Sequence, residues 1–136
     1  MKNIGVIGLG DMGSGIALNL IKNGFKVFGS DLLPARQQAF KNMGGSLEIS
    51  IADIGKKCDA VFVMVMNGSQ AKSIIFDEDG LARNMEAGST VILSATIKPS
   101  EAEEIGHLIK DTGLQFIDTP VSGGFPGAQS GTLTLM

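Results

Sequence analysis

The chain has 136 residues, which is enough for one domain with a hydrophobic core and too short for two domains of ordinary size. Its 11 basic and 14 acidic residues are spread evenly, so we expect no nucleic-acid partner and no membrane partner, and neither a membrane span nor a signal peptide is recognisable. One cysteine and one histidine exclude an intrachain disulfide and most zinc sites, which leaves a cytoplasmic domain as the expectation.

Short strand-like runs alternate with helix-like runs along the chain. The runs predicted as strands are rich in Val, Ile and Phe, and several are apolar at consecutive positions, as in a parallel sheet covered on both faces. They span residues 3–8, 26–30, 59–65, 89–94 and 114–118. The predicted helices span residues 14–23, 34–43, 51–57, 70–76 and 100–112. This alternation predicts a doubly wound α/β domain, with a mostly parallel Rossmann-type sheet and helices on both faces.

The first predicted strand leads into a glycine-rich turn within "VIGLGDMGSGIALNL", where Gly8, Gly10 and Gly13 form G-x-G-x-x-G. The first glycine of this motif permits a tight turn, and the second lets the backbone approach a pyrophosphate. The third lets helix and strand pack closely, while amides at the helix N-terminus hold the anion. Nineteen glycines make a chance match easy, so the motif alone is weak. The predicted cofactor-binding residues of this turn are Gly8, Leu9, Gly10, Asp11, Met12 and Gly13.

An acidic residue follows the second predicted strand. Asp31 lies 18 positions after Gly13, near the spacing of about 20 expected for a carboxylate that binds the adenosine ribose hydroxyls. A carboxylate there also repels a ribose phosphate, so NAD is favoured over NADP as the cofactor. Asp31 can equally serve as an N-cap or turn residue, and Arg36 lies close enough in sequence to keep NADP open.

The last stretch, "DTPVSGGFPGAQSGTLTLM", follows the final predicted strand and is rich in glycine and proline. One interpretation is simply a long turn. The other starts from its position, because ligands of open α/β sheets bind beyond the carboxyl ends of the strands. Gly123 and Gly124 offer unobstructed amides and Ser122 a hydroxyl, which together suit a small carboxylate-bearing substrate.

Both stretches resemble the β-hydroxyacid dehydrogenases, the family that includes 3-hydroxyisobutyrate dehydrogenase and tartronate semialdehyde reductase, although Ile16 stands where these enzymes usually have Met. The resemblance implies that Ser122, Gly123 and Gly124 contact substrate. "VMNGSQ" resembles the loop that covers the cofactor, with Asn67 in place of a common Pro, and "SATIKPS" resembles a segment near the nicotinamide. Within this family, "FKVFGSDL" together with Gly15 slightly more closely resembles the L-threonate dehydrogenases. The cofactor-binding residues implied by the two loops are Val65, Met66, Asn67 and Thr96.

The chain departs from this family in one respect. Family members carry a catalytic lysine in a helical second domain, within a motif resembling G-x-x-G-x-G-x-x-x-K, and nothing in this sequence matches it. Lys98 is better interpreted as a solvated residue before Pro99, His107 as a surface or half-buried helix residue, and Cys58 as a packing residue, so no catalytic residue is assigned. We therefore expect residues 1–136 to be the NAD-binding domain of a longer, homo-oligomeric enzyme, inactive by itself toward its small hydroxyacid substrate.

Two other functions fit part of the pattern. Imine reductases share the N-terminal architecture and lack the lysine, but they favour NADP. The carboxylate of Asp31 argues against NADP and therefore against this alternative. A non-catalytic module that senses nucleotides or binds a protein would keep the fold and lose the chemistry. The intact "PVSGG" segment argues against that loss.

Overall fold

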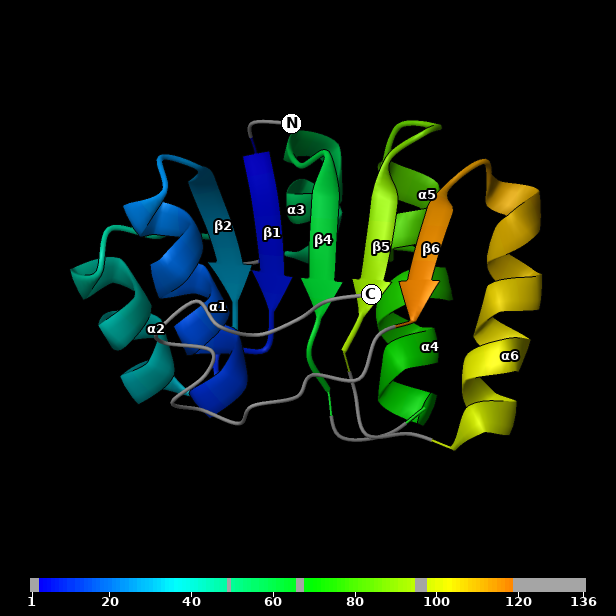
Figure 1. Cartoon of the computed structure of the whole chain (residues 1–136), viewed down its shortest axis with the longest axis horizontal. Helices are drawn as coiled ribbons and strands as arrows, with labels where there is room; N and C mark the ends of the chain where they lie inside the picture. The colour runs from blue at the N-terminus through cyan, green and yellow to red at the C-terminus, as the bar shows by residue number, and fades with distance from the viewer. Residues whose placement is uncertain (1–2, 49, 66–67, 95–97, 119–136) are drawn as a thin grey trace.

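The computed structural model describes residues 3–48, 50–65, 68–94 and 98–118. Within these ranges the strands form one six-stranded sheet in the order β3-β2-β1-β4-β5-β6, and every neighbouring pair is parallel. All carboxyl ends therefore meet at one edge of the sheet (Figure 1). The predicted doubly wound fold is confirmed. The strands are β1 (Asn3–Ile7), β2 (Lys26–Ser30), β3 (Ser46–Leu47), β4 (Ala60–Val63), β5 (Thr90–Leu93) and β6 (Gln115–Asp118).

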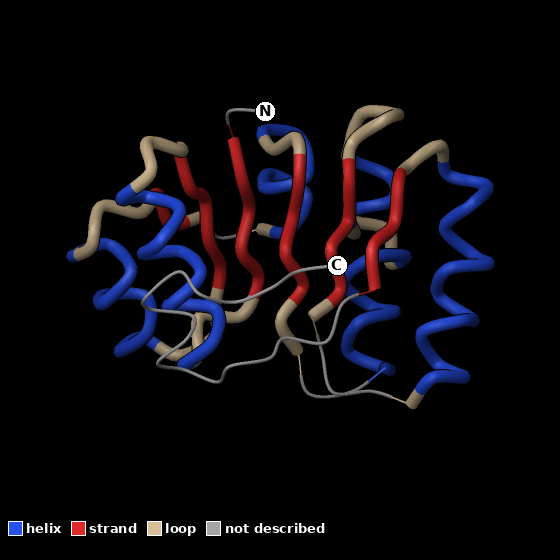
Figure 2. Tube along the Cα trace, in the orientation of Figure 1, coloured by secondary structure: helices blue, strands red, loops and turns tan. Residues whose placement is uncertain are grey.

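Helices flank both faces of this sheet (Figure 2). Successive side chains of a strand point to opposite faces, so Ala60 and Phe62 of β4 join one core while Val61 and Val63 join the other. The first core is closed by α1 and α2, and the second by α3 to α6. The helices are α1 (Asp11–Lys22), α2 (Pro34–Asn42), α3 (Ile51–Lys57), α4 (Gly68–Phe76), α5 (Leu81–Asn84) and α6 (Pro99–Ile109), the last followed by the 3-10 turn η1 (Lys110–Thr112).

Helix and strand boundaries differ from the predicted ones at a few points. The two-residue β3 and the four-residue α5 are absent from the prediction, because elements this short show no usable periodicity. Helix α1 begins at Asp11 rather than Ser14, so part of the glycine-rich motif forms its first turn. It ends as predicted, with Asn23 as its C-cap and Gly24 at a φ of +90°.

The single cysteine is a core residue, as predicted. Cys58 follows α3 and is 5% exposed, packed in the cluster that α3 to α6 cover. Burial, together with the smaller effect of the nearby acidic groups of Asp59 and Glu48, raises the pKa of its thiol to about 12. A thiol this strongly protonated at neutral pH is a packing group and a poor nucleophile.

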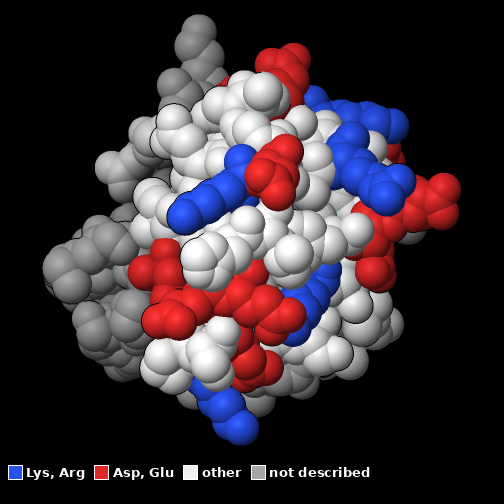
Figure 3. Space-filling model, turned by 90° about the vertical axis from the view of Figure 1, so that its right-hand side faces the viewer, with Lys and Arg blue, Asp and Glu red and all other residues white. Residues whose placement is uncertain are grey.

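On the face closed by α1 and α2, the sheet is covered less completely at β5 and β6. On the face closed by α1 and α2, Ile92 of β5 is only partly buried, and its register partner in β6, Ile117, is 39% exposed. The exposed residues of α6 include Glu103, Glu104 and His107 together with Leu108, and both acidic and basic side chains are visible among uncharged residues in Figure 3. In the described part of the chain, no helix has the length and hydropathy needed to cross a membrane.

Candidate functional site

The turn after β1 is tight and requires glycine at its first position. Gly8 has a φ of +96°, and its amide donates to the carbonyl oxygen of Ser30 at 2.9 Å. A β-carbon at Gly8 would overlap the carbonyl oxygen of Met64, so both the conformation and the space exclude a side chain. This bond and this contact seat the turn between the carboxyl ends of β2 and β4.

The other two motif glycines differ from each other. Gly13 is buried in the first turn of α1, and a β-carbon there would overlap the carbonyl oxygen of Gly8. A β-carbon on Gly10 would lie 3.6 Å from Cζ of Arg36, which is an ordinary van der Waals distance. The fold therefore needs glycine at positions 8 and 13, whereas at position 10 a β-carbon would make only van der Waals contact with the Arg36 guanidinium.

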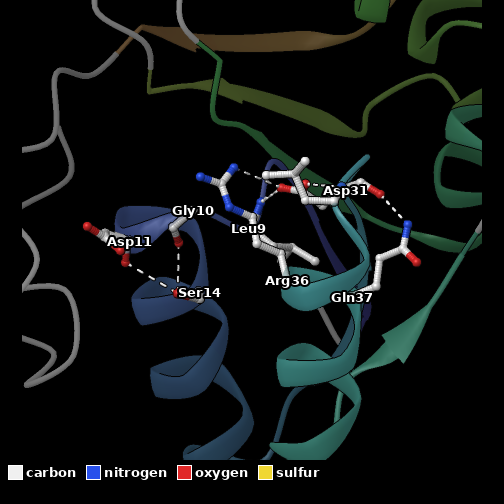
Figure 4. Close-up of polar contacts among 8 residues, drawn as sticks. Leu9, Gly10, Asp11, Ser14, Asp31, Arg36 and Gln37 are labelled. Carbon is white, nitrogen blue, oxygen red and sulfur yellow. Dashed lines mark hydrogen bonds and ion pairs between the residues drawn. The ribbon is translucent and has the colours of Figure 1, made fainter.

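The beginning of α1 faces the same turn. The Ser14 amide donates to the Gly10 carbonyl at 2.8 Å, and its hydroxyl donates to that oxygen at 2.7 Å, which fixes the start of the helix (Figure 4). The amides before Ser14 are those of the helix N-terminus, which have no acceptor within the helix. Together with the helix dipole they favour an anion at this point.

Asp31 lies directly beside the glycine turn, at the end of β2. Its Oδ2 accepts from the Leu9 amide at 2.7 Å and its Oδ1 from the Leu33 amide at 2.9 Å, and Oδ2 lies 3.6 Å from Nη1 of Arg36 (Figure 4). The carboxylate side chain is only 6% exposed, whereas the Arg36 side chain is 48% exposed. The bond to Leu33 is that of an Asx turn, so the predicted turn role is confirmed. Each oxygen still has capacity to accept from a further donor.

A cleft of about 530 Å³ opens where these groups meet. It brings together Gly8, Asp31 and Val65, three of the predicted cofactor-binding residues, which are distant in sequence. Its size falls in the range typical of ligand sites. Leu32 and Leu33 line the cleft although they are 95% and 50% exposed, so they give it an apolar border toward solvent. The remaining lining residues are Ile7, Ser30, Arg36, Ile51, Met64, Ser69, Gln70, Ser73 and Ile74.

These features fit a nicotinamide dinucleotide. Gly10 leaves open the space that a side chain would take from a pyrophosphate, and the N-terminus of α1 supplies amides for the anion. Asp31 presents a fixed carboxylate within the same cleft, and Leu32 and Leu33 offer apolar surface for a flat base. The other predicted residues, Met66, Asn67, Thr96, Ser122, Gly123 and Gly124, lie outside the described residues.

Sequence reasoning missed two features of this edge of the sheet. Helix α4 begins at Gly68, so its first turn brings Ser69 and Gln70 to the cleft, where the prediction started the helix at Gln70. Ser94, just after β5, is 8% exposed, and its hydroxyl has no hydrogen-bond partner in the described part of the chain. The position of Ser94 at a strand end in "STVILSATIKPS" is the only sequence signal for it.

Comparison with known proteins agrees with this geometry. The chain is 44% identical over 135 residues to L-threonate dehydrogenase of Cupriavidus necator, and the match covers 99% of this chain and 46% of that protein. Among solved structures, 3-hydroxyisobutyrate dehydrogenase from Mycobacterium tuberculosis with L-serine matches with a TM-score of 0.93 at 29% identity, over 100% of this chain and 46% of the other. The chain thus spans less than half the length of these relatives. The resemblance to β-hydroxyacid dehydrogenases is confirmed.

Imine reductases share the fold alone. The enzyme from Myxococcus stipitatus in complex with NADP+ matches with a TM-score of 0.86 at 18% identity, over 93% of this chain and 43% of that one. Residues 3–136 match the family described as the NAD binding domain of 6-phosphogluconate dehydrogenase. The cofactor of this chain is therefore NAD, as predicted from the sequence. The chain belongs to this family of NAD-binding domains.

Proposed function

We propose that this chain is the cofactor-binding part of a cytoplasmic enzyme that transfers a hydride between a small hydroxyacid and NAD. One observation carries the choice of cofactor: the Asp31 carboxylate is almost fully buried and held at 2.7 Å by the Leu9 amide, inside the cleft beside the glycine turn. A carboxylate fixed there accepts bonds from ribose hydroxyls and repels a phosphate on the same ribose.

The residues divide the binding between them. The turn from Gly8 to Gly13 and the N-terminus of α1 would hold the pyrophosphate, and Asp31 the adenosine ribose. Val65, with Met66 and Asn67, would cover the cofactor, and Thr96 would lie toward the nicotinamide, as the family resemblance implies. When bound, NAD supplies the acceptor for the hydride. The chain's own residues bind and orient that cofactor.

The substrate would be held by Ser122, Gly123 and Gly124. The relatives are named L-threonate and 3-hydroxyisobutyrate dehydrogenases, which supports a small hydroxyacid and makes L-threonate the first compound to test. The group that moves the substrate hydroxyl proton would be the family's lysine, on a helical domain outside residues 1–136. Oligomerisation would accompany that domain.

The test measures binding and turnover separately. We expect calorimetry on the purified chain to show NAD binding at least about tenfold tighter than NADP binding, and Asp31→Ala to weaken NAD and to reduce the difference. Equal affinities, or tighter NADP binding as in the imine reductase alternative, would contradict the assignment. We also expect no NADH production from L-threonate or other small hydroxyacids. Robust turnover would show that the proton-transfer group lies within these residues.

A further inference from the structure

Arg36 is placed where it can contact a bound dinucleotide. It stands on the first turns of α2 and lines the cleft, with Nη1 at 3.6 Å from Oδ2 of Asp31. The guanidinium also lies across Gly10, since a β-carbon there would be 3.6 Å from Cζ and Nη1 and 3.7 Å from Nη2. The only other arginine of the sequence, Arg83, is on α5 and does not line the cleft.

The contact between Arg36 and Asp31 is a weak one for such a pair. The atoms are separated by 3.6 Å, and the Arg36 side chain is 48% exposed. Half-exposed ion pairs of this kind contribute little to stability, because solvent screens them and the arginine loses rotamer freedom. The carboxylate meanwhile is fixed by two backbone amides, so the guanidinium is the partner that can exchange its contact for another anion.

We propose that Arg36 is a latent binding group for a phosphate on the 2′ position of the adenosine ribose, and that Asp31 keeps it from being used. This inference rests on the proposed function, because it requires a dinucleotide in the cleft. A guanidinium presents paired donors that match a phosphate, and a phosphate on the ribose bound by Asp31 would come next to Arg36. The negative charge of Asp31 opposes that phosphate. Removing the charge leaves the arginine as its partner.

The competing role for Arg36 is a contact with the pyrophosphate, since the guanidinium also lies over Gly10. The two roles predict different ligand dependence. A pyrophosphate contact strengthens NAD and NADP alike. A contact with the 2′-phosphate strengthens the binding of NADP relative to NAD. It likewise strengthens the binding of adenosine 2′,5′-bisphosphate relative to 5′-AMP. These four compounds are therefore the probes.

The experiment is a calorimetric double-variant cycle on the chain, with Asp31→Asn, Arg36→Gln and the two combined. Asn keeps a carbonyl oxygen for the Leu9 amide while removing the charge, and Gln keeps much of the arginine stem. Arg83→Gln removes the same charge outside the cleft and is the matched control. We expect Asp31→Asn to bind NADP and the bisphosphate about tenfold more tightly than the unmodified chain does. Adding Arg36→Gln abolishes this gain, whereas adding Arg83→Gln preserves it.

A gain in NADP affinity that survives in the Asp31→Asn, Arg36→Gln variant would overturn the proposal, as would an Arg36→Gln effect in the Asp31→Asn background that is equal for NAD and NADP. If Asp31→Asn does not fold, Asp31→Ala, which also removes the charge, takes its place. In that background, adding Arg36→Gln should weaken NADP by about tenfold and change NAD by less than about twofold. Failure of the unmodified chain to bind any of the four probes would refute the proposed function itself, which is a different result.

Discussion

The buried polar side chains at the carboxyl ends of β2 and β5 differ in whether they have hydrogen-bond partners among the described residues. At β2, the Asp31 carboxylate is 6% exposed and has two backbone amides and a guanidinium around it. At β5, the Ser94 residue is 8% exposed, and among the described residues its hydroxyl meets no partner. Both ends lie at the same edge of the sheet, where ligands of this fold bind.

The difference separates two parts of this edge among the described residues. The β2 end is held in its binding geometry by bonds within the protein, so a ligand there meets groups that are already oriented. A buried hydroxyl without a partner costs about 1–3 kcal/mol, and the β5 end carries that cost among the described residues. The β2 end of the cleft is thus preorganised, whereas at the β5 end one buried polar group meets no partner among the described residues.

Gly10→Val is expected to give the largest effect and tests whether the preorganised end binds a dinucleotide. The new side chain would fill the space left for the pyrophosphate, so NAD affinity should fall by at least about 100-fold. The thermal midpoint should change little, because a β-carbon at this position makes only ordinary contacts. Gly106→Ala is the control, since its β-carbon would likewise meet only Phe116, at 3.6 Å. NAD binding retained in folded Gly10→Val would contradict the proposed site.

Gly13→Ala should act on stability. Its β-carbon would overlap the Gly8 carbonyl oxygen, and relieving this overlap must move α1 away from the turn. We expect the free energy of unfolding in urea to fall by about 1–3 kcal/mol. Unchanged stability would show that α1 is not seated on the turn as described, and the distinction between the glycine at position 10 and that at position 13 would fail.

The glycine turn also shows how far sequence reasoning reaches. The motif and the spacing to Asp31 are local patterns, and they predicted the tight turn, the close packing and the acid at the end of β2. The contact of Arg36 with Gly10 depends on how α2 packs beside α1, which no short-range pattern encodes. Whether the Ser94 hydroxyl meets a partner among the described residues likewise depends on how neighbouring elements bury it. Strand β3 has only two residues, which are too few to show a strand pattern in the sequence.

Asp31→Ala should have a smaller effect, divided between binding and stability. Losing the carboxylate removes the proposed acceptor for the ribose hydroxyls and leaves the Leu9 and Leu33 amides without this partner. We expect NAD affinity to fall about tenfold and the free energy of unfolding to fall by about 1–2 kcal/mol. Asp31→Asn should retain more of the stability than Asp31→Ala, because its amide oxygen can still accept from Leu9. Equal stability losses in the two variants would mean that the bond to Leu9 contributes nothing.

Ser94→Ala should give the smallest effect, and its sign distinguishes the two ends. If the buried hydroxyl has no partner, its removal relieves a desolvation cost, and the free energy of unfolding should rise by about 0.5–1 kcal/mol. Ser14→Ala is the matched control, because the Ser14 hydroxyl donates to the Gly10 carbonyl at 2.7 Å and its loss should lower that free energy by about 1 kcal/mol. Both variants delete one oxygen atom near the same edge of the sheet, so urea unfolding compares them directly. Opposite signs would support the contrast between a completed and an uncompleted end. A loss in Ser94→Ala as large as that in Ser14→Ala would show that Ser94 is hydrogen-bonded in solution, and the two ends would then be equally preorganised.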